Sequence, residues 1–310
     1  MNRSLRLLAP AKVNLGLRVL GRRSDGYHEL RTVFHAVDLC DELQVAPDDG
    51  VEGPSLEILS TSQTGLPVVA DDDNLVLRAA RAVADAVGRP LRARFRLHKH
   101  IPAGAGLGGG SSDAAAALRL GNRLLGDPLQ DRTLEQLAVG LGADVPFFLR
   151  GDTCWGSGIG EELTPVVPAP RLAFVLVLPP FGTSTAAVFK SLSAALIDDS
   201  TRDSFRSIES ARTAAFAAIG PHDNDLEAPA MACTAGLSEL RAALVAAGLA
   251  DVRMSGSGST LFLACPDLGT ARRQAETAES AVAGPFGAHV VVAASAGSRH
   301  EIEDVLGGGA

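Results

Sequence analysis

The chain has 310 residues, of which 46% are hydrophobic and 21% charged, a composition typical of a soluble globular protein without a large disordered segment. Since single cores usually stop growing at about 250 to 300 residues, this length favours two packed domains. The formal net charge of −8 argues against a broad cationic surface for nucleic acid or for an anionic membrane. We therefore expect a small-molecule ligand.

The cysteines and the apolar runs further narrow the class of protein that we expect. Four widely spaced cysteines form no C-x-x-C pair, which indicates neither a zinc ribbon nor a redox dithiol. Polar residues interrupt the first apolar run, so no signal peptide is expected, and the longest runs, such as LAFVLVL, are too short to span a membrane. We expect a reduced, cytoplasmic protein without a membrane partner, either a monomer or a homodimer.

The first elements predicted along the chain are strands. Alternation over residues 4–20 predicts one or two strands with a break at Pro10, and Asp25-Gly26 predicts a hairpin turn. The chain continues as a strand through LRTVFHAVDL, and a short strand is expected near residues 56–59. The N-terminal region is therefore expected to contain an antiparallel hairpin.

Helices and a glycine-rich loop follow. Helical spacing predicts a helix over residues 71–87, whose acidic start suits a helix N-terminus. Alternation predicts a strand over residues 91–97 that leads into the glycine loop. The next predicted helix covers residues 111–125, with Ser and Asp available as caps, and DRTLEQLAVGLG predicts another.

The second half alternates helices and strands irregularly, which favours α+β layers over a doubly wound parallel sheet. A proline-rich stretch near residues 160–170 suggests a boundary between domains at 1–165 and 166–310. The predicted elements are a strand at 171–180, helices at 183–196, 204–219 and 237–248, two short strands around a glycine-serine turn at 251–265, a helix at 269–283 and a strand at 289–294.

The glycine loop is the strongest local signal. From Gly104 to Ser111 it fits the phosphate-loop pattern G-x-x-x-x-G-K-[ST], except that Gly110 stands where the lysine should be. A strand, a glycine-rich turn and a helix N-terminus together favour phosphate binding, because backbone N–H groups and the helix dipole converge on an anion. The missing lysine excludes a standard P-loop NTPase. If the loop holds ATP, charge compensation must come from backbone dipoles, a magnesium ion and a basic residue elsewhere in the sequence.

A competing interpretation of the same loop is a dinucleotide site. Gly104, Gly106 and Gly109 also satisfy G-x-G-x-x-G. Such a site requires an acidic residue about 20 residues further on, at the end of the next parallel strand. The segment after Leu125 is a polar helix instead, so an NAD(P)-dependent reductase is the weaker alternative.

Two residues could supply the missing charge and a base. Lys12 is one of only three lysines among 28 basic residues, and alternation places it on one strand face with Asn14. Asp144 lies among apolar residues, where it could accept a proton from a substrate hydroxyl with Lys12 close by. The structural alternatives are a solvated strand face for Lys12 and a helix cap for Asp144.

Three segments together resemble a known family. PAKVNLGLRVLGRRSDGYHEL, IPAGAGLGGGSSDAAAAL and MSGSGSTLF resemble the three ordered motifs of the GHMP small-molecule kinases. DGYHEL and GADVPFF resemble the branch that acts on a cytidine-diphosphate-linked methylerythritol. The resemblance implies an α+β, two-domain GHMP kinase fold with a ribosomal protein S5 domain 2-like N-terminal domain and a ferredoxin-like C-terminal domain. It also implies ATP-dependent phosphorylation of the 2-hydroxyl of that substrate.

The resemblance also implies site residues. Lys12 and Asp144 match the catalytic pair, and one segment matches the ATP phosphate loop. The loop residues are Pro102, Ala103, Gly104, Ala105, Gly106, Leu107, Gly108, Gly109, Gly110, Ser111 and Ser112. The matches to substrate-binding residues are Asn14, Tyr27, His28, Phe189, Gly256, Ser257 and Gly258. Asp113 stands where asparagine is common in the family, a difference expected to affect helix capping more than chemistry.

Three points stay open at this level. Mg²⁺ is expected with ATP, but no acidic cluster marks its ligands, and His98 and His100 are interpreted as structural. A kinase for another small alcohol, such as homoserine or mevalonate, is an alternative, as is a non-catalytic nucleotide-binding module. Tyr27, the only tyrosine, is also compatible with a simple hairpin role.

Overall fold

The first of two sheets is built on a long antiparallel hairpin. The computed structural model describes residues 4–60, 66–192, 224–297 and 301–305. The hairpin strands β1 (Ser4–Arg22) and β2 (His28–Pro47) flank the predicted turn, where Gly26 has a φ of +89°. β1 does not break at Pro10, because a bulge between Pro10 and Ala11 keeps it continuous. The other strands of this sheet are β3 (Ser55–Ser60), β4 (Ala93–His98), β5 (Thr153–Ser157), β6 (Glu162–Pro165) and β11 (Glu303–Val305).

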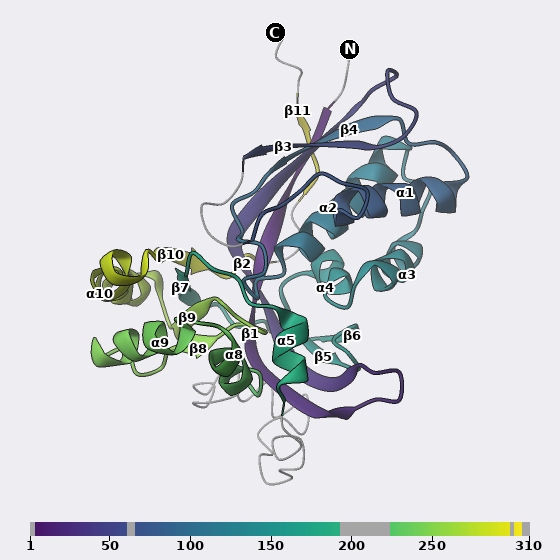
Figure 1. Ribbon diagram of the computed structural model, residues 1–310. Coiled ribbons are helices and arrows are strands. Elements are labelled where there is room, and N and C mark those ends of the chain that lie inside the picture. The colour runs from purple at the N-terminus through teal and green to yellow at the C-terminus, as the bar shows by residue number, and fades with distance from the viewer. Residues whose placement is uncertain (1–3, 61–65, 193–223, 298–300, 306–310) are drawn as a thin grey trace.

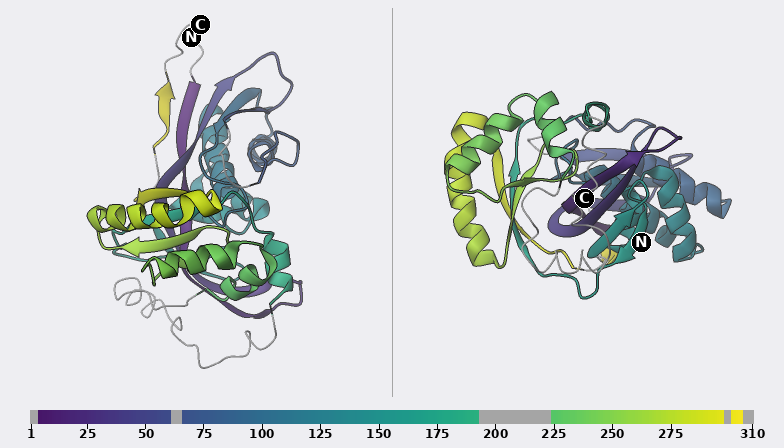
Figure 2. Two further views of the ribbon diagram at one scale, coloured as in Figure 1. Left: turned by 60° about the vertical axis from the view of Figure 1, so that its left-hand side comes forward. Right: turned by 90° about the horizontal axis from the view of Figure 1, so that it is seen from below.

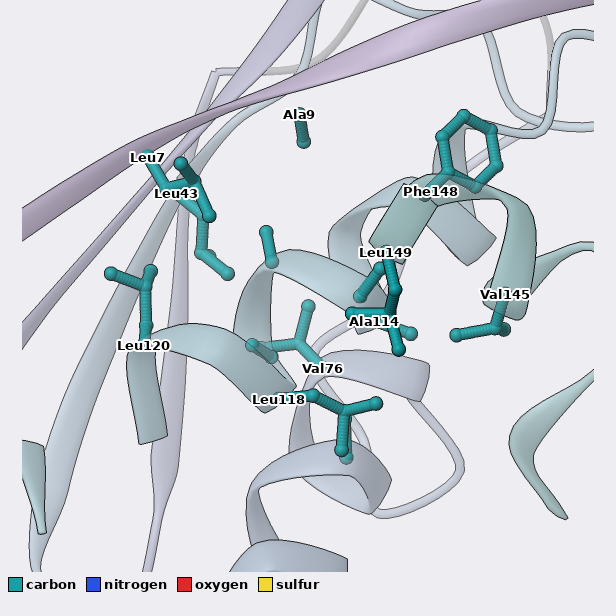
Figure 3. Packing of buried hydrophobic residues seen from close by; sticks show 14 of the residues in the cluster. Leu7, Ala9, Leu43, Val76, Ala114, Leu118, Leu120, Val145, Phe148 and Leu149 are labelled. Atoms are coloured by element: carbon teal, nitrogen blue, oxygen red, sulfur yellow. The ribbon is translucent and has the colours of Figure 1, made fainter. Parts of the chain in front are cut away.

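Helices cover one face of this sheet (Figure 1). They are α1 (Leu75–Val87), α2 (Gly109–Leu124), α3 (Asp131–Leu141) and α4 (Val145–Arg150). The alanine run Ala114–Ala117 on α2 is fully buried, because such small side chains let the helix approach the strands closely. Leu7 and Leu43 of the sheet and Leu118 of α2 belong to this core (Figure 3).

The second sheet lies between the first sheet and an outer layer of helices. Its strand order is β10 (His289–Ala294), β7 (Ala173–Leu178), β9 (Leu261–Cys265) and β8 (Arg253–Met254). The buried residues of β7 alternate: Val175 and Val177 pack in the core with the outer helices, whereas Phe174 and Leu176 pack against residues of β1. The helices here are α5 (Thr185–Lys190), α8 (Glu227–Cys233), α9 (Leu237–Ala246) and α10 (Leu268–Phe286), and α9 and α10 cover the outer face (Figure 2).

The two halves of the chain are interleaved. Leu17 and Val19 of β1 pack in the core of the second sheet, and β11, near the end of the chain, pairs with β1. The α+β architecture that we expected is present, with its strands in two sheets, while a division of the chain at residue 165 stays a prediction. None of the helices within the described ranges is long and apolar enough to cross a membrane.

Several element boundaries differ from the prediction. α2 begins at Gly109, after Gly108 in a left-handed conformation, and no side chain caps it. The predicted capping role of the serines and Asp113 is therefore wrong, because these residues lie inside the helix. α1 begins after Asn74, whose side chain caps Val76 N–H, so the acidic run 71–73 precedes the helix. The predicted helix at 204–219 lies outside the described residues.

A buried histidine joins the two sheets. His35 of β2 is fully buried, and its ring nitrogens lie 2.8 Å from Thr153 Oγ1 and 2.8 Å from Ser295 Oγ. Ser295 also accepts the Leu172 N–H at the start of the second sheet. Burial, and secondly repulsion from Arg171, lowers the pKa of His35 from 6.5 to about 4. The neutral ring is therefore part of the folded structure.

This histidine predicts a loss of stability in acid. Because the folded-state pKa is below the unfolded one, the stabilisation is complete above pH 6.5 and is lost as the pH falls toward 4, by up to roughly 3 kcal/mol. Urea unfolding at several pH values should show this decline in the wild type. In His35→Gln the contribution should be missing, so the two stabilities should converge as the pH falls. A constant difference between them from pH 7 to pH 4.5 would contradict the assignment.

Candidate active site

A cavity of about 1030 Å³ lies where the β1–β2 hairpin, the glycine loop and α5 meet. Most of the predicted site residues line it. These are Lys12, Asn14, Tyr27, His28, Pro102, Ala103, Gly104, Ala105, Gly106, Gly108, Gly109, Gly110, Ser111, Asp144, Phe189, Gly256 and Ser257. Leu107 and Ser112 are instead buried beneath the loop, and Gly258 does not line the cavity either. The fold thus brings all three sequence motifs and Asp144 to one cavity.

Lys12 is buried rather than solvated, so the alternative of a solvated strand face is wrong. Its side chain is only 4% exposed, and Nζ donates to Asn14 Oδ1 at 2.5 Å and to Gly106 O at 2.9 Å. An ammonium has three donors, so one is left for a further acceptor. Burial lowers the pKa of Lys12, and attraction by Asp144 offsets only part of that effect. The bonds to fixed oxygens hold the amine at the cavity wall.

Asp144 lies next to Lys12 in the wall of the cavity. Its Oδ2 lies 3.8 Å from Lys12 Nζ, and its side chain is 33% exposed. It occupies the N-cap position of α4, yet its side chain accepts no capping hydrogen bond, so the alternative role as a cap is wrong. A carboxylate that is accessible, uncommitted to the helix and close to a buried cation can accept a proton from a bound hydroxyl.

The carbonyl of Gly106 links the three motifs. It accepts Lys12 Nζ of the first motif at 2.9 Å and Ser255 Oγ of the third motif at 2.9 Å. Asn14 N–H donates to the same Ser255 Oγ at 3.3 Å, and Asn14 Nδ2 donates to Thr32 Oγ1 at 2.7 Å. The position of the lysine is therefore set by the conformation of the glycine loop.

The loop itself has the backbone of an anion site. Gly104, Gly106 and Gly108 have φ of +68°, +76° and +71°, so alternate residues are left-handed, as in backbone nests that bind anions. Within the described part of the chain, no backbone N–H from Gly104 to Ser111 donates a hydrogen bond to a protein acceptor. These donors, together with the N-terminus of α2, are available to a phosphate group.

Gly106 offers a direct test of the loop geometry. A Cβ at this position would lie 2.1 Å from Ser255 O, and the φ of +76° costs an L-residue roughly 1–2 kcal/mol. We expect Gly106→Ala to shift the loop, to lower kcat/KM for ATP by about tenfold or more and to reduce the free energy of unfolding. Gly126→Ala is the matched control, since Gly126 has a φ of +92° but no atom within 4 Å of its Cβ position. Equal kcat/KM values for the two variants would argue against this close approach.

Aromatic rings lie along the hairpin side of the cavity. The His28 and Phe189 rings are stacked, with centroids 5.0 Å apart, and Tyr27 is 61% exposed. Burial, and secondly repulsion from Arg22, lowers the pKa of His28, which favours a neutral ring with one donor and one acceptor. Stacking faces beside a neutral polar ring suit a nucleobase. The predicted set Tyr27, His28 and Phe189 is therefore brought together.

Sequence reasoning missed residues that support this wall. Phe34 lies under Lys12, with Nζ 5.6 Å from its ring centroid. Thr185 Oγ1 and Ser257 Oγ are 2.8 Å apart, which joins α5 to the glycine-serine turn. Alternation along β2 could have placed Phe34 on the side of Lys12, but nothing in the sequence signals the Thr185 contact. Other lining residues that were not predicted include Arg22, Leu30, Leu75, Ala143, Lys190, Leu192 and Leu226.

A buried ion cluster beneath the loop was also missed. Lys99 Nζ bonds to Asp41 Oδ2 and, at 2.9 Å, to Asp113 Oδ2. Burial lowers the pKa of Lys99, but attraction by the two carboxylates together outweighs it, so the pKa is raised. Burial raises the pKa of Asp113 to about 7 against the attraction of Lys99. Asp113 therefore has an electrostatic role, not the capping role that was expected.

Family models match both halves of the chain. The GHMP kinases N terminal domain matches residues 74–152, and the GHMP kinases C terminal domain matches residues 207–283. The chain is 44% identical over 284 residues to 4-diphosphocytidyl-2-C-methyl-D-erythritol kinase of Bordetella bronchiseptica, which covers 91% of this chain and 89% of the relative. A kinase of the same name from Methylorubrum extorquens is 43% identical, with 88% of this chain and 92% of the relative covered.

Solved structures agree with these relatives. A crystal structure of 4-(cytidine 5'-diphospho)-2C-methyl-D-erythritol kinase has a TM-score of 0.72 and 36% identity, and covers 94% of this chain and 100% of that chain. Homoserine kinase from Cytophaga hutchinsonii has a TM-score of 0.73 with 97% of each chain covered, but at 19% identity it shows the fold alone.

The fold and the three motifs around one cavity define a GHMP kinase. Within that class, the chain belongs to the 4-diphosphocytidyl-2-C-methyl-D-erythritol kinase family. The reductase alternative is not retained. Among the described residues, no strand after α2 pairs in parallel with β4, the strand that enters the loop: the next strand in sequence, β5, pairs with β2 and β6 instead. A dinucleotide-binding fold needs that adjacent parallel strand.

Proposed function

We propose that this chain transfers the γ-phosphoryl group of ATP to the 2-hydroxyl of 4-diphosphocytidyl-2-C-methyl-D-erythritol, giving the 2-phosphate and ADP in the non-mevalonate isoprenoid pathway. The observation that carries the proposal is the joint position of Lys12. Its amine is bonded to the carbonyl of loop residue Gly106 and lies 3.8 Å from Asp144. A phosphate cradle, a cation and a base thus meet at one point.

In this proposal the glycine loop binds the ATP phosphates. The open N–H groups between Gly104 and Ser111 and the N-terminus of α2 replace the lysine side chain of a standard phosphate loop. Gly110 has no protein atom closer than 3.7 Å to its Cβ position, so space around it is left for the nucleotide. The cation comes from Lys12, which is on a different strand.

The acceptor hydroxyl lies between Asp144 and the γ-phosphate. The oxygen of the 2-hydroxyl attacks the γ-phosphorus and bonds to it, while Asp144 accepts the proton of that hydroxyl. The bond between the γ-phosphorus and the β,γ-bridging oxygen breaks, and ADP leaves. The third donor of Lys12 offsets the charge on the transferring group. Tyr27, His28 and Phe189 hold the cytosine, and Asn14 with the Gly256–Gly258 turn shapes the remainder of the pocket.

Mg²⁺ fits the site only as an ion that arrives with the nucleotide. Among the described residues, no group of three or more His, Cys, Asp or Glu side chains could hold a metal ion. Magnesium is often bound through one or two protein oxygens plus substrate phosphates, and the Ser111 hydroxyl beside the loop is such a donor. The ion would neutralise charge on the β- and γ-phosphates. Chelation with EDTA should therefore abolish transfer.

The test is ADP release with a panel of acceptor alcohols. We expect turnover with 4-diphosphocytidyl-2-C-methyl-D-erythritol and none above background with homoserine or mevalonate, because those lack a base to stack on Phe189. ³¹P NMR of the product should show a new phosphate monoester. Turnover of a smaller alcohol alone would favour another GHMP kinase activity, and ATP binding without ADP release from any acceptor would favour a nucleotide-binding module.

A further inference from the structure

The buried cluster of Lys99, Asp41 and Asp113 connects three separate elements. Asp41 is on β2, Lys99 directly follows β4 and Asp113 is on α2. Their side chains are 2%, 0% and 4% exposed, and none of them lines the cavity. Lys99 bridges the two carboxylates, so this cation fixes how the helix sits on the sheet.

Both ends of the phosphate loop contact residues of this cluster. Before the loop, Asp41 Oδ1 accepts the N–H groups of His100 at 2.6 Å and Ile101 at 2.9 Å. After the loop, a Cβ on Gly109 would lie 3.0 Å from Lys99 Nζ and 2.8 Å from Ile101 Cγ2. The first residue of α2 therefore packs directly on Lys99 and on the residue that enters the loop.

We propose that Lys99 is a positioning residue for ATP. By bridging Asp41 and Asp113 behind Gly109, it sets the separation of the two loop ends and thereby the direction of the N–H groups that bind the phosphates. Lys99 acts through the backbone and touches neither the nucleotide nor the acceptor. This inference rests on the ATP-binding role proposed above for the loop.

A positional role accounts for the charges better than a stabilising one. Buried ion pairs are weak evidence for stability, since apolar residues of similar volume often serve as well or better. Charges and hydrogen bonds do, however, specify which atoms meet. Here they specify the meeting of β2, the residues that enter the phosphate loop and the first turn of α2.

The bridge can be cut without leaving an unpaired charge in the cluster. Asp113→Leu removes the link to α2 and leaves Lys99 and Asp41 as a neutral pair. Asp113→Asn is the conservative control, because its amide oxygen can still accept from Lys99. Arg96→Met, in the exposed pair with Glu57 on β3, controls for the loss of an ion pair as such. The readouts are KM for ATP, KM for the alcohol acceptor and the shift of Tm on adding ATP.

We expect Asp113→Leu to raise KM for ATP by about tenfold or more and to lose most of the ATP-induced Tm shift, with KM for the acceptor within about twofold of wild type. Asp113→Asn and Arg96→Met should resemble the wild type. Should Asp113→Leu fail to fold, the variant combining Lys99→Met, Asp41→Asn and Asp113→Asn removes the bridge without buried charge and is measured in the same way.

Three results would overturn the inference. One is an unchanged KM for ATP in the folded variant that lacks the bridge; another is an equal rise of both KM values; the third is a lower Tm with the ATP-induced shift retained. The wild type separates this failure from failure of the proposed function. If the wild type releases no ADP with the cytidine-containing acceptor, the proposed function fails, whereas an active wild type with unaffected variants refutes only the role of Lys99.

Discussion

Asp144→Asn is expected to lower kcat by about 10² to 10⁴ while leaving ATP binding nearly intact. The amide has the size of the carboxylate but cannot take the proton of the acceptor hydroxyl. Asp144 caps no helix N–H, so its loss should not unfold α4. The measurement is kcat at saturating ATP and acceptor, with ATP affinity from a thermal shift.

The control for Asp144→Asn is Asp71→Asn, an exposed aspartate before α1 that does not line the cavity. It should leave kcat unchanged. Wild-type turnover in Asp144→Asn would exclude Asp144 as the base. A reduced kcat that is accompanied by an equal loss of ATP affinity would instead indicate a binding role.

Lys12→Met is expected to lower kcat by about 10² to 10³. Methionine keeps the length of the stem, so the change removes the cation and its donors without opening a large cavity. The amine holds Gly106 O and faces Asp144, so its loss should affect the transition state more than ground-state binding. Steady-state kinetics with each substrate varied in turn separates kcat from both KM values.

The matched control is Lys190→Met at the end of α5, since Lys190 lines the same cavity and directly follows Phe189 in sequence. It should leave kcat unchanged at saturating substrate. An effect of Lys12→Met that is confined to KM for ATP would count against a role in the transition state. So would an equal fall of kcat in both lysine variants.

Sequence patterns were sufficient where local chemistry determines the structure. Asp25-Gly26 predicts the hairpin because glycine adopts positive φ without strain, and Gly26 has a φ of +89°. The order strand, glycine loop and helix was also predicted. The start of α2 was wrong by two residues, because Gly108 and backbone geometry begin this helix, not a serine cap.

Long-range partners could not be predicted. Lys99 stood out as one of three lysines, but its partners Asp41 and Asp113 lie 58 and 14 residues away, and no local pattern joins them. The acceptor for Lys12 is the backbone carbonyl of Gly106, which every residue type possesses and no motif marks. Such contacts arise from the packing of β1, β2 and α2, and only the fold reveals them.

A crystal structure with a non-hydrolysable ATP analogue and 4-diphosphocytidyl-2-C-methyl-D-erythritol tests the central claim most directly. The measured quantity is the distance from the acceptor 2-hydroxyl oxygen to the nearer Asp144 carboxylate oxygen. We predict about 2.6–3.2 Å, with the γ-phosphate on the loop from Gly104 to Gly110 and in contact with Lys12 Nζ. A 2-hydroxyl out of hydrogen-bond reach of Asp144, with the phosphates bound away from the glycine loop, would contradict the account.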